Sequence, residues 1–167
     1  MSAVISDCGR YRYRLDRVLD PENPNTMCFI MCNPSTADAE KDDATIRSCK
    51  RLALANGCGR ITVVNLWAYR ARDPKALKAV ILAGGFDATG GVQARMHCLT
   101  AFQDASLVVA AWGRVGAMTP GFEIEKAKMR SLLARKGRSV YCFGVTKDGV
   151  PRHPLLLGTD TPLVRLP

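Results

Sequence analysis

Two short polar segments carry the residue types in this sequence that are best suited to chemistry. Residues 33–38 (NPSTAD) contain the amide of Asn33, and residues 151–155 (PRHPL) contain the imidazole of His153. An amide can hold a water molecule or read the edge of a base, and an imidazole can donate a hydrogen bond to an oxygen that gains negative charge. We therefore predict that the two segments come together in the folded chain and form a site for a planar, hydrogen-bonding ligand such as a nucleobase.

Four apolar or β-branched runs predict the buried strands that position these segments. They are residues 27–32, 60–66, 107–112 and 138–143. The first run leads directly into the NPSTAD segment, and the last leads through a glycine-rich turn into the PRHPL segment.

Helical patterns separate the predicted strands. They start at Asp42 or Asp43, at Asp73-Pro74, at Val92 and at Thr119-Pro120. This alternation predicts an α/β three-layer sandwich with a central, mainly parallel four-stranded sheet. Residues 11–16 alternate between apolar and polar types, which predicts an additional antiparallel edge strand with Arg12 and Arg14 on its solvated face.

Parallel strands share one edge at their carboxyl ends, where open α/β folds bind ligands. We expect this edge to carry Asn33, Pro34, Ser35, Asn65, Trp67, Tyr69, Arg70, Trp112, Gly113, Arg114, Arg152, His153 and Pro154. Amides and aromatic rings suit a base, and arginines suit phosphate. We therefore predict a nucleobase site at this edge of the sheet, in which the residues that contact the nucleobase are Asn65, Pro34, Ser35 and Trp67.

Composition limits the class of protein. A chain of 167 residues with 47% hydrophobic and 23% charged residues predicts one folded domain, residues 1–167. The short apolar runs predict a cytoplasmic protein with no membrane contact, and we expect a monomer. A net charge of +9 favours nucleic acid, DNA above all, or a nucleotide as the partner. Scattered cysteines and two histidines predict reduced, mostly buried thiols, with no metal and no cofactor.

Four motifs together resemble a bacterial and phage domain family of unknown function. They are Asn33–Asp38, Val64–Leu66 with Tyr69–Ala71, Ala111–Gly113 and Pro151–Leu155. The resemblance covers most of the chain.

The same motifs are more distantly similar to the uracil-DNA glycosylase superfamily. The similarity implies a glycosylase-like fold in which Asn33 positions the attacking water and Asn65 reads the base edge. It also implies that His153 stabilises the base oxygen and that Leu155 or Leu156 probes the duplex. Arg70, Arg114, Arg152 and Leu155 are the expected nucleic-acid contacts.

Three functions follow from these patterns. The leading hypothesis is hydrolysis of the N-glycosidic bond of a modified or deaminated base, with Asn33 and His153 as catalytic residues. The second is a non-catalytic module that binds a modified base or nucleotide, and the third is an enzyme of free nucleotides or nucleosides. Asp38 is the alternative general base. For Trp67 and Trp112, a place in the core is the simpler role.

Overall fold

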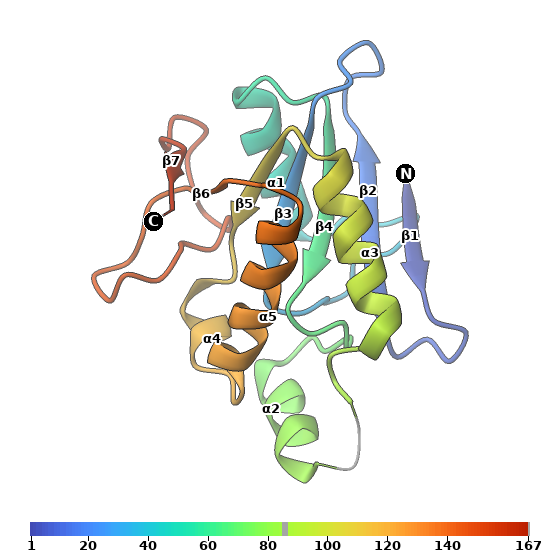
Figure 1. The fold of residues 1–167 in the computed structure, drawn as a ribbon. Helices are drawn as coiled ribbons and strands as arrows, with labels where there is room; N and C mark the ends of the chain where they lie inside the picture. The colour runs from blue at the N-terminus through green and yellow to red at the C-terminus, as the bar shows by residue number, and fades with distance from the viewer. Residues whose placement is uncertain (85–86, 167) are drawn as a thin grey trace.

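Residues 1–84 and 87–166, which the computed structural model describes, form a seven-stranded sheet and five helices (Figure 1). The strands are β1 (Ser2–Ile5), β2 (Arg12–Val18), β3 (Thr26–Met31), β4 (Arg60–Asn65), β5 (Leu107–Ala110), β6 (Val140–Cys142) and β7 (Val164–Arg165). The helices are α1 (Ala44–Ala55), α2 (Pro74–Ala83), α3 (Gly91–Asp104), α4 (Gly113–Ala117) and α5 (Phe122–Arg135). Across the sheet the strands follow the order β1-β2-β4-β3-β5-β6-β7.

The four predicted strands form the parallel centre of the sheet. β4, β3, β5 and β6 are parallel neighbours, and Phe29 of β3 is in register with Val63 of β4 and Val109 of β5. β1, β2 and β7 extend this centre with antiparallel pairs. The α/β class is confirmed, but a four-stranded sheet is wrong because the sheet is wider and mixed. β1 and β7 are too short to show a period of two, so only their pairing defines them.

Helices cover both faces of the sheet, as expected from the side-chain alternation of a strand. Met27 and Phe29 of β3 face a core shared with Ile46 and Leu52 of α1. The intervening side chains of β3 face a second core, which includes Phe102 of α3 and residues of α5. In Figure 1, α3 and α5 lie in front of the sheet and α1 lies behind it.

Two aspartates set the starts of helices near the carboxyl ends of the strands. Asp43 caps α1 by accepting a hydrogen bond from the backbone N–H of Ile46 at 2.9 Å, and Asp73 caps α2 through Lys75 at 2.8 Å. Each carboxylate satisfies an N–H that has no partner within its own helix. Both helix starts follow the predicted pattern, and the first brings Asp43 to the edge of the sheet.

The segment after β5 differs from the prediction. The strand ends at Ala110, and a short helix, α4, begins at Gly113. Gly113 has a φ of +66°, a left-handed conformation that ends the extended run. α5 then starts at Phe122, with Gly121 at its N-cap, rather than at Thr119-Pro120.

The arginines of β2 also differ from the prediction. β2 is not an edge strand, because β1 pairs with it on the outer side. Arg12 and Arg17 are buried, with 3% and 1% of their surface exposed, while Arg14 pairs with Asp16. The alternation predicted that Arg12 and Arg14 share a face of β2, but it did not predict that the segments with Ala37 and Asn65 cover Arg12, or that Asp42 contacts Arg17.

The cysteines are free thiols. Cys8 is exposed and the others are buried, namely Cys28, Cys32, Cys49, Cys58, Cys98 and Cys142. Within residues 1–84 and 87–166, no helix is long and apolar enough to cross a membrane.

Candidate functional site

A pocket of about 520 Å³ lies where β3 and β5 end and where α1 and α4 begin. This volume is typical of small-molecule sites. The polar residues that line it are Arg12, Asn33, Ser35, Asp43, Thr45, Arg72, Trp112, Arg114 and His153, and Leu155 is part of the wall. The NPSTAD and PRHPL segments therefore meet at one pocket, although most of the chain separates them in sequence.

Two backbone carbonyls fix the amide of Asn33. Its Nδ2 donates to the carbonyl oxygens of Pro34 at 3.0 Å and Ala71 at 2.9 Å. Both hydrogens of the amide are thus used to tie the loop together. Its Oδ1 accepts no hydrogen bond from the rest of the described chain and is the group that this amide offers to a ligand or a water molecule.

The local hydrogen bond of His153 determines where its proton lies. Nδ1 accepts from the backbone N–H of Leu155 at 3.2 Å, so the neutral ring carries its proton on Nε2. Burial lowers the pKa of His153 below its usual value, although the carboxylate of Asp43 opposes this shift. At neutral pH the ring is therefore uncharged and offers one N–H donor.

The lowered pKa predicts a specific dependence of stability on pH. The unfolded chain takes up a proton at His153 near pH 6.5, as a free histidine does, whereas the folded chain takes it up only at lower pH. We expect the free energy of unfolding to fall as the pH decreases from about 6.5 through the folded pKa, and to level off below it. Urea unfolding of the wild type and of His153→Asn across this range measures the effect. A difference between the two proteins that does not change with pH would contradict it.

Gly113 allows His153 to lie against the end of β5. A Cβ atom at Gly113 would stand 2.8 Å from the Cβ of His153, closer than side-chain atoms approach in folded proteins. Gly113 also has a φ of +66°. The glycine is therefore required both by its backbone conformation and by the position of the imidazole.

We expect Gly113→Ala to destabilise the fold and to displace His153. Gly121→Ala is the matched control, because Gly121 also has a positive φ, +78°, but a Cβ there would meet no atom within 4 Å. Both variants lose about 1–2 kcal/mol from the left-handed conformation, and Gly113→Ala loses about 1 kcal/mol or more in addition from the close contact. Urea unfolding gives the energies, and the NMR shifts of the His153 ring report its position. If both variants lose the same free energy of unfolding and the NMR shifts of the His153 ring do not change, the neighbouring groups accommodate the added methyl group without cost, which would contradict the prediction.

Asp43 brings a carboxylate into the pocket. One of its oxygens caps α1, and the residue also lines the pocket with Asn33 and His153. The sequence predicted only its capping role. A carboxylate just after a strand-end loop, at the start of a helix, is the signal that identifies such a residue.

Arg12 is another pocket residue that sequence reasoning missed, as it also missed Thr45 and Arg72. β2 runs antiparallel to β4, so its start lies beside the end of β4, at the same edge of the sheet as the predicted site. Arg12 donates from Nη1 to the carbonyl of Ala37 at 3.0 Å and from Nη2 to Oδ1 of Asn65 at 3.4 Å. Burial lowers the pKa of Arg12 to about 10, so the guanidinium remains charged at neutral pH.

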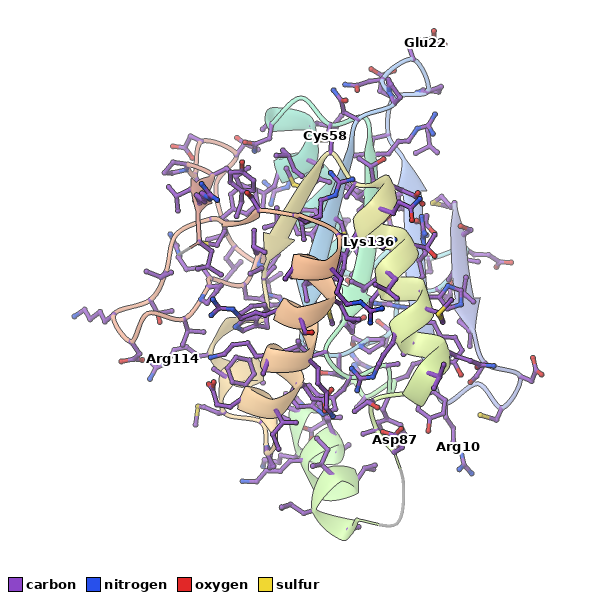
Figure 2. All side chains as sticks on the ribbon, viewed as in Figure 1. Arg10, Glu22, Cys58, Asp87, Arg114 and Lys136 are labelled. Atoms are coloured by element: carbon purple, nitrogen blue, oxygen red, sulfur yellow. The ribbon has the colours of Figure 1, made fainter. Side chains whose placement is uncertain are left out.

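Six of the thirteen residues expected at this edge line the pocket, namely Asn33, Ser35, Trp112, Gly113, Arg114 and His153. Leu155, expected from the glycosylase resemblance, lines it as well. Arg114, which is labelled in Figure 2, lies at the start of α4. It also pairs with Asp148 at 3.2 Å.

The other predicted site residues lie outside the lining. Asn65 is buried behind Arg12, Trp67 is a core residue with 2% exposure, and the carbonyl of Pro34 accepts from Ala71. Arg70 donates to the carbonyl of Gly9 at 3.2 Å, and Arg152 is exposed outside the lining.

Asp38 closes a turn outside the pocket. Its Oδ1 accepts from the backbone N–H groups of Glu40 and Lys41, each at 2.9 Å. These hydrogen bonds lower the pKa of Asp38 below its usual value, which makes it a weaker base. Asp43, which lines the pocket, is better placed to act as a base.

Among the residues with described positions, no three histidine, cysteine, aspartate or glutamate side chains are placed to hold an ion. The pocket instead offers one amide oxygen, one carboxylate and several N–H donors. This set suits recognition of a ligand and activation of water by hydrogen bonding.

Comparison with known proteins identifies a family for this chain. Residues 12–155 match the model of the family described as "Protein of unknown function (DUF1643)". No curated protein and no solved structure matches the chain. The matched range covers most of the 167 residues and includes every pocket residue described above, from Arg12 to Leu155. The chain therefore belongs to the DUF1643 family.

Proposed function

We propose that this protein is a uracil-DNA glycosylase-like hydrolase that removes a modified or deaminated base from DNA. The observation that carries the proposal is that Asn33 and His153 line the same pocket at the carboxyl ends of the central strands. A base in duplex DNA must leave the helix to reach such a pocket. The net charge of +9 supports a polyanionic partner.

The proposed reaction assigns a role to each reactive group. Oδ1 of Asn33 accepts a hydrogen bond from a water molecule and orients it toward C1′ of the sugar. The water oxygen bonds to C1′ as the bond from C1′ to the base nitrogen breaks, and its proton passes to the carboxylate of Asp43. The electron pair leaves with the base, where Nε2–H of His153 stabilises the oxygen that becomes negative.

The surface beside the pocket supports a duplex as the substrate. Leu156 has 91% of its surface exposed and a φ of +68°, which is an unfavourable combination for a large apolar side chain. It borders a shallow hollow with Arg47, Lys50 and Arg51 of α1. An apolar wedge beside basic side chains suits a base stack and its flanking phosphates. The glycosylase resemblance offered Leu155 or Leu156 as the residue that probes the duplex. Leu155 is only 40% exposed, so Leu156 is the better candidate.

Base release from defined oligonucleotides tests the proposed function. Single-stranded and duplex oligonucleotides with uracil, 5-hydroxymethyluracil or hypoxanthine are incubated with the protein, and abasic product is detected by alkaline cleavage. We expect product that is lost in Asn33→Ala and His153→Ala, and binding that weakens steeply between about 50 and 200 mM salt. Binding without abasic product would instead identify a non-catalytic module. Activity on free nucleosides with little dependence on salt would identify a nucleoside hydrolase.

Leu156→Gly should separate stability from activity on duplex DNA. Glycine adopts a φ of +68° without strain, so we expect no loss of folding stability. Loss of the wedge removes the group that replaces the extruded base, so base release from duplex should fall about tenfold or more, with release from single strands unchanged. Leu82→Gly, at an exposed position of α2 away from the pocket, is the control for activity. An equal loss on both substrates would argue against a wedge.

A further inference from the structure

The buried groups at the pocket that lack partners are all hydrogen-bond donors. Among the described residues, four buried side-chain N–H groups have no partner, namely those at Nε of Arg12, Nδ2 of Asn65, Nε1 of Trp112 and Nε of Arg70. Arg12 and Trp112 line the pocket, and Asn65 lies directly behind Arg12. Buried polar groups are normally paired, so unpaired donors at a pocket indicate that its ligand supplies acceptors.

Among these donors that line the pocket, Arg12 is the one whose orientation is fixed by hydrogen bonds to other residues, so that it can donate to a ligand there. Only 3% of the surface of Arg12 is exposed, and its contacts with the carbonyl of Ala37 and Oδ1 of Asn65 fix the plane of the guanidinium. Those contacts use one of the two hydrogens on each of Nη1 and Nη2, so Nε–H has no partner and Nη2 keeps a second N–H for a ligand. A guanidinium edge fixed in this way matches two neighbouring acceptor atoms on a ligand.

Two kinds of ligand present such a pair of acceptors: an oxyanion, and a base edge with a keto oxygen beside a ring nitrogen. Asp43 lines the same pocket, and its negative charge acts on Arg12. At Arg12 itself, this carboxylate partly balances the positive charge and would repel an oxyanion, which favours a neutral base edge there. Arginine pairs in this manner with O6 and N7 of guanine. The other lining arginines, Arg72 and Arg114, suit the phosphates of the nucleotide.

Common bases differ at the atoms that would face Arg12. Hypoxanthine and guanine, the 6-oxopurines, present O6 and N7, which are both acceptors. Adenine presents an amino donor beside N7, so one N–H of Arg12 would face another donor. Uracil alternates acceptor, donor and acceptor, so no two adjacent positions of its edge both accept.

We propose that Arg12 contacts the edge of the bound base and selects a 6-oxopurine, such as hypoxanthine, over adenine and uracil. The inference rests on the proposed function in that the ligand is a base entering this pocket. It assigns base reading to Arg12 rather than to Asn65, which lies behind it.

Changes in the ligand test the inference without changing the protein. Wild-type binding is measured for oligonucleotides that differ only in one nucleotide, which carries hypoxanthine, 7-deazahypoxanthine, adenine or uracil. Replacement of N7 by carbon removes one acceptor, so we expect hypoxanthine to bind about tenfold to a hundredfold more tightly than its 7-deaza analogue and than adenine. Equal binding of hypoxanthine and 7-deazahypoxanthine, or a preference for uracil, would overturn the inference.

A competition experiment distinguishes the base edge from an oxyanion. Inorganic phosphate and chloride are compared at matched ionic strength as competitors of the hypoxanthine oligonucleotide. We expect equal effects of the two salts. Specific displacement by phosphate would assign Arg12 to an oxyanion and overturn the proposal.

Arg12→Lys tests the residue itself, because lysine keeps the charge but lacks the planar edge. We expect the ratio of hypoxanthine to 7-deazahypoxanthine affinity to fall to about one, while Arg14→Lys on the same strand keeps the wild-type ratio. An unchanged ratio in folded Arg12→Lys would overturn the inference, and the wild-type ligand series decides it where that variant does not fold.

Binding and base release separate this inference from the proposed function. Hypoxanthine-dependent binding without abasic product would support the role of Arg12 while contradicting the hydrolase. Release of hypoxanthine and of 7-deazahypoxanthine at the same rate, with equal binding of the two oligonucleotides, would support the hydrolase and contradict the role of Arg12.

Discussion

His153→Ala is expected to slow base release by about 10²- to 10³-fold, the usual effect of removing a donor to a developing oxyanion. The donor is Nε2–H, since Nδ1 is held by the N–H of Leu155. As the bond from C1′ to the base breaks, negative charge grows on the base oxygen, and without the imidazole that charge has one fewer donor. Single-turnover measurements of abasic product give the rate of the chemical step.

Two further variants make this result specific. His97→Ala removes the other histidine, which stacks on Tyr13 at a ring distance of 5.6 Å and lies outside the pocket, so its rate should remain that of the wild type. His153→Gln restores an N–H donor and should recover part of the rate. A rate loss of equal size in the alanine variants of both histidines would indicate a general structural effect and contradict the proposed role.

Arg17→Ala is expected to lower the free energy of unfolding by about 3–4 kcal/mol, because it breaks a buried charge network. The side chain of Arg17 is 0% exposed and its Nε donates to Asp42 at 2.8 Å. It also donates to the carbonyls of Ser2, Asp16 and Asp38. The substitution leaves these acceptors buried without their donor, and urea unfolding measures the cost.

Arg14→Ala is the matched control on the same strand. Arg14 also pairs with an aspartate, Asp16 at 2.8 Å, but both side chains are partly exposed. Its loss should therefore be about 1 kcal/mol or less. A similar loss from both variants would mean that burial does not strengthen the contacts of Arg17.

The Arg17 network also connects the fold to the pocket. Asp42, which it holds, directly precedes the pocket residue Asp43 at the start of α1. Burial by itself would raise the pKa of Asp42. The hydrogen bonds and positive charges of Arg17 and Lys50 together lower that pKa by more, so it lies below its usual value. The stability from this pair is therefore present at neutral pH and is lost as the pH falls through that lowered pKa.

The sequence predicted the centre of the fold because its signals there are local. Continuous apolar runs such as residues 27–32 identify buried strands, and Asp73-Pro74 identifies a helix start. Alternation of strands and helices then requires parallel strands whose carboxyl ends share one edge. This reasoning placed Asn33 and His153 at the same edge, and both line the same pocket.

The sequence alone did not identify which of the polar side chains would line the pocket. Arg12 and Arg14 alternate with apolar residues in the same way, yet Arg12 is buried at the pocket and Arg14 pairs at the surface. Likewise, Asp43 has the same sequence signature whether it only caps a helix or also faces a pocket. Trp67, expected beside the base, is enclosed in the core.

By itself, then, the sequence determined the α/β class, the central strands, the starts of α1 and α2, and the two loops that meet. Tertiary structure alone decided the width of the sheet and which polar side chains the pocket encloses. The physical reason is that periodicity records the face on which a side chain lies, whereas burial depends on which distant segment covers that face. For Arg12 those segments are the ones that carry Ala37 and Asn65, and nothing near residue 12 in the sequence encodes their approach.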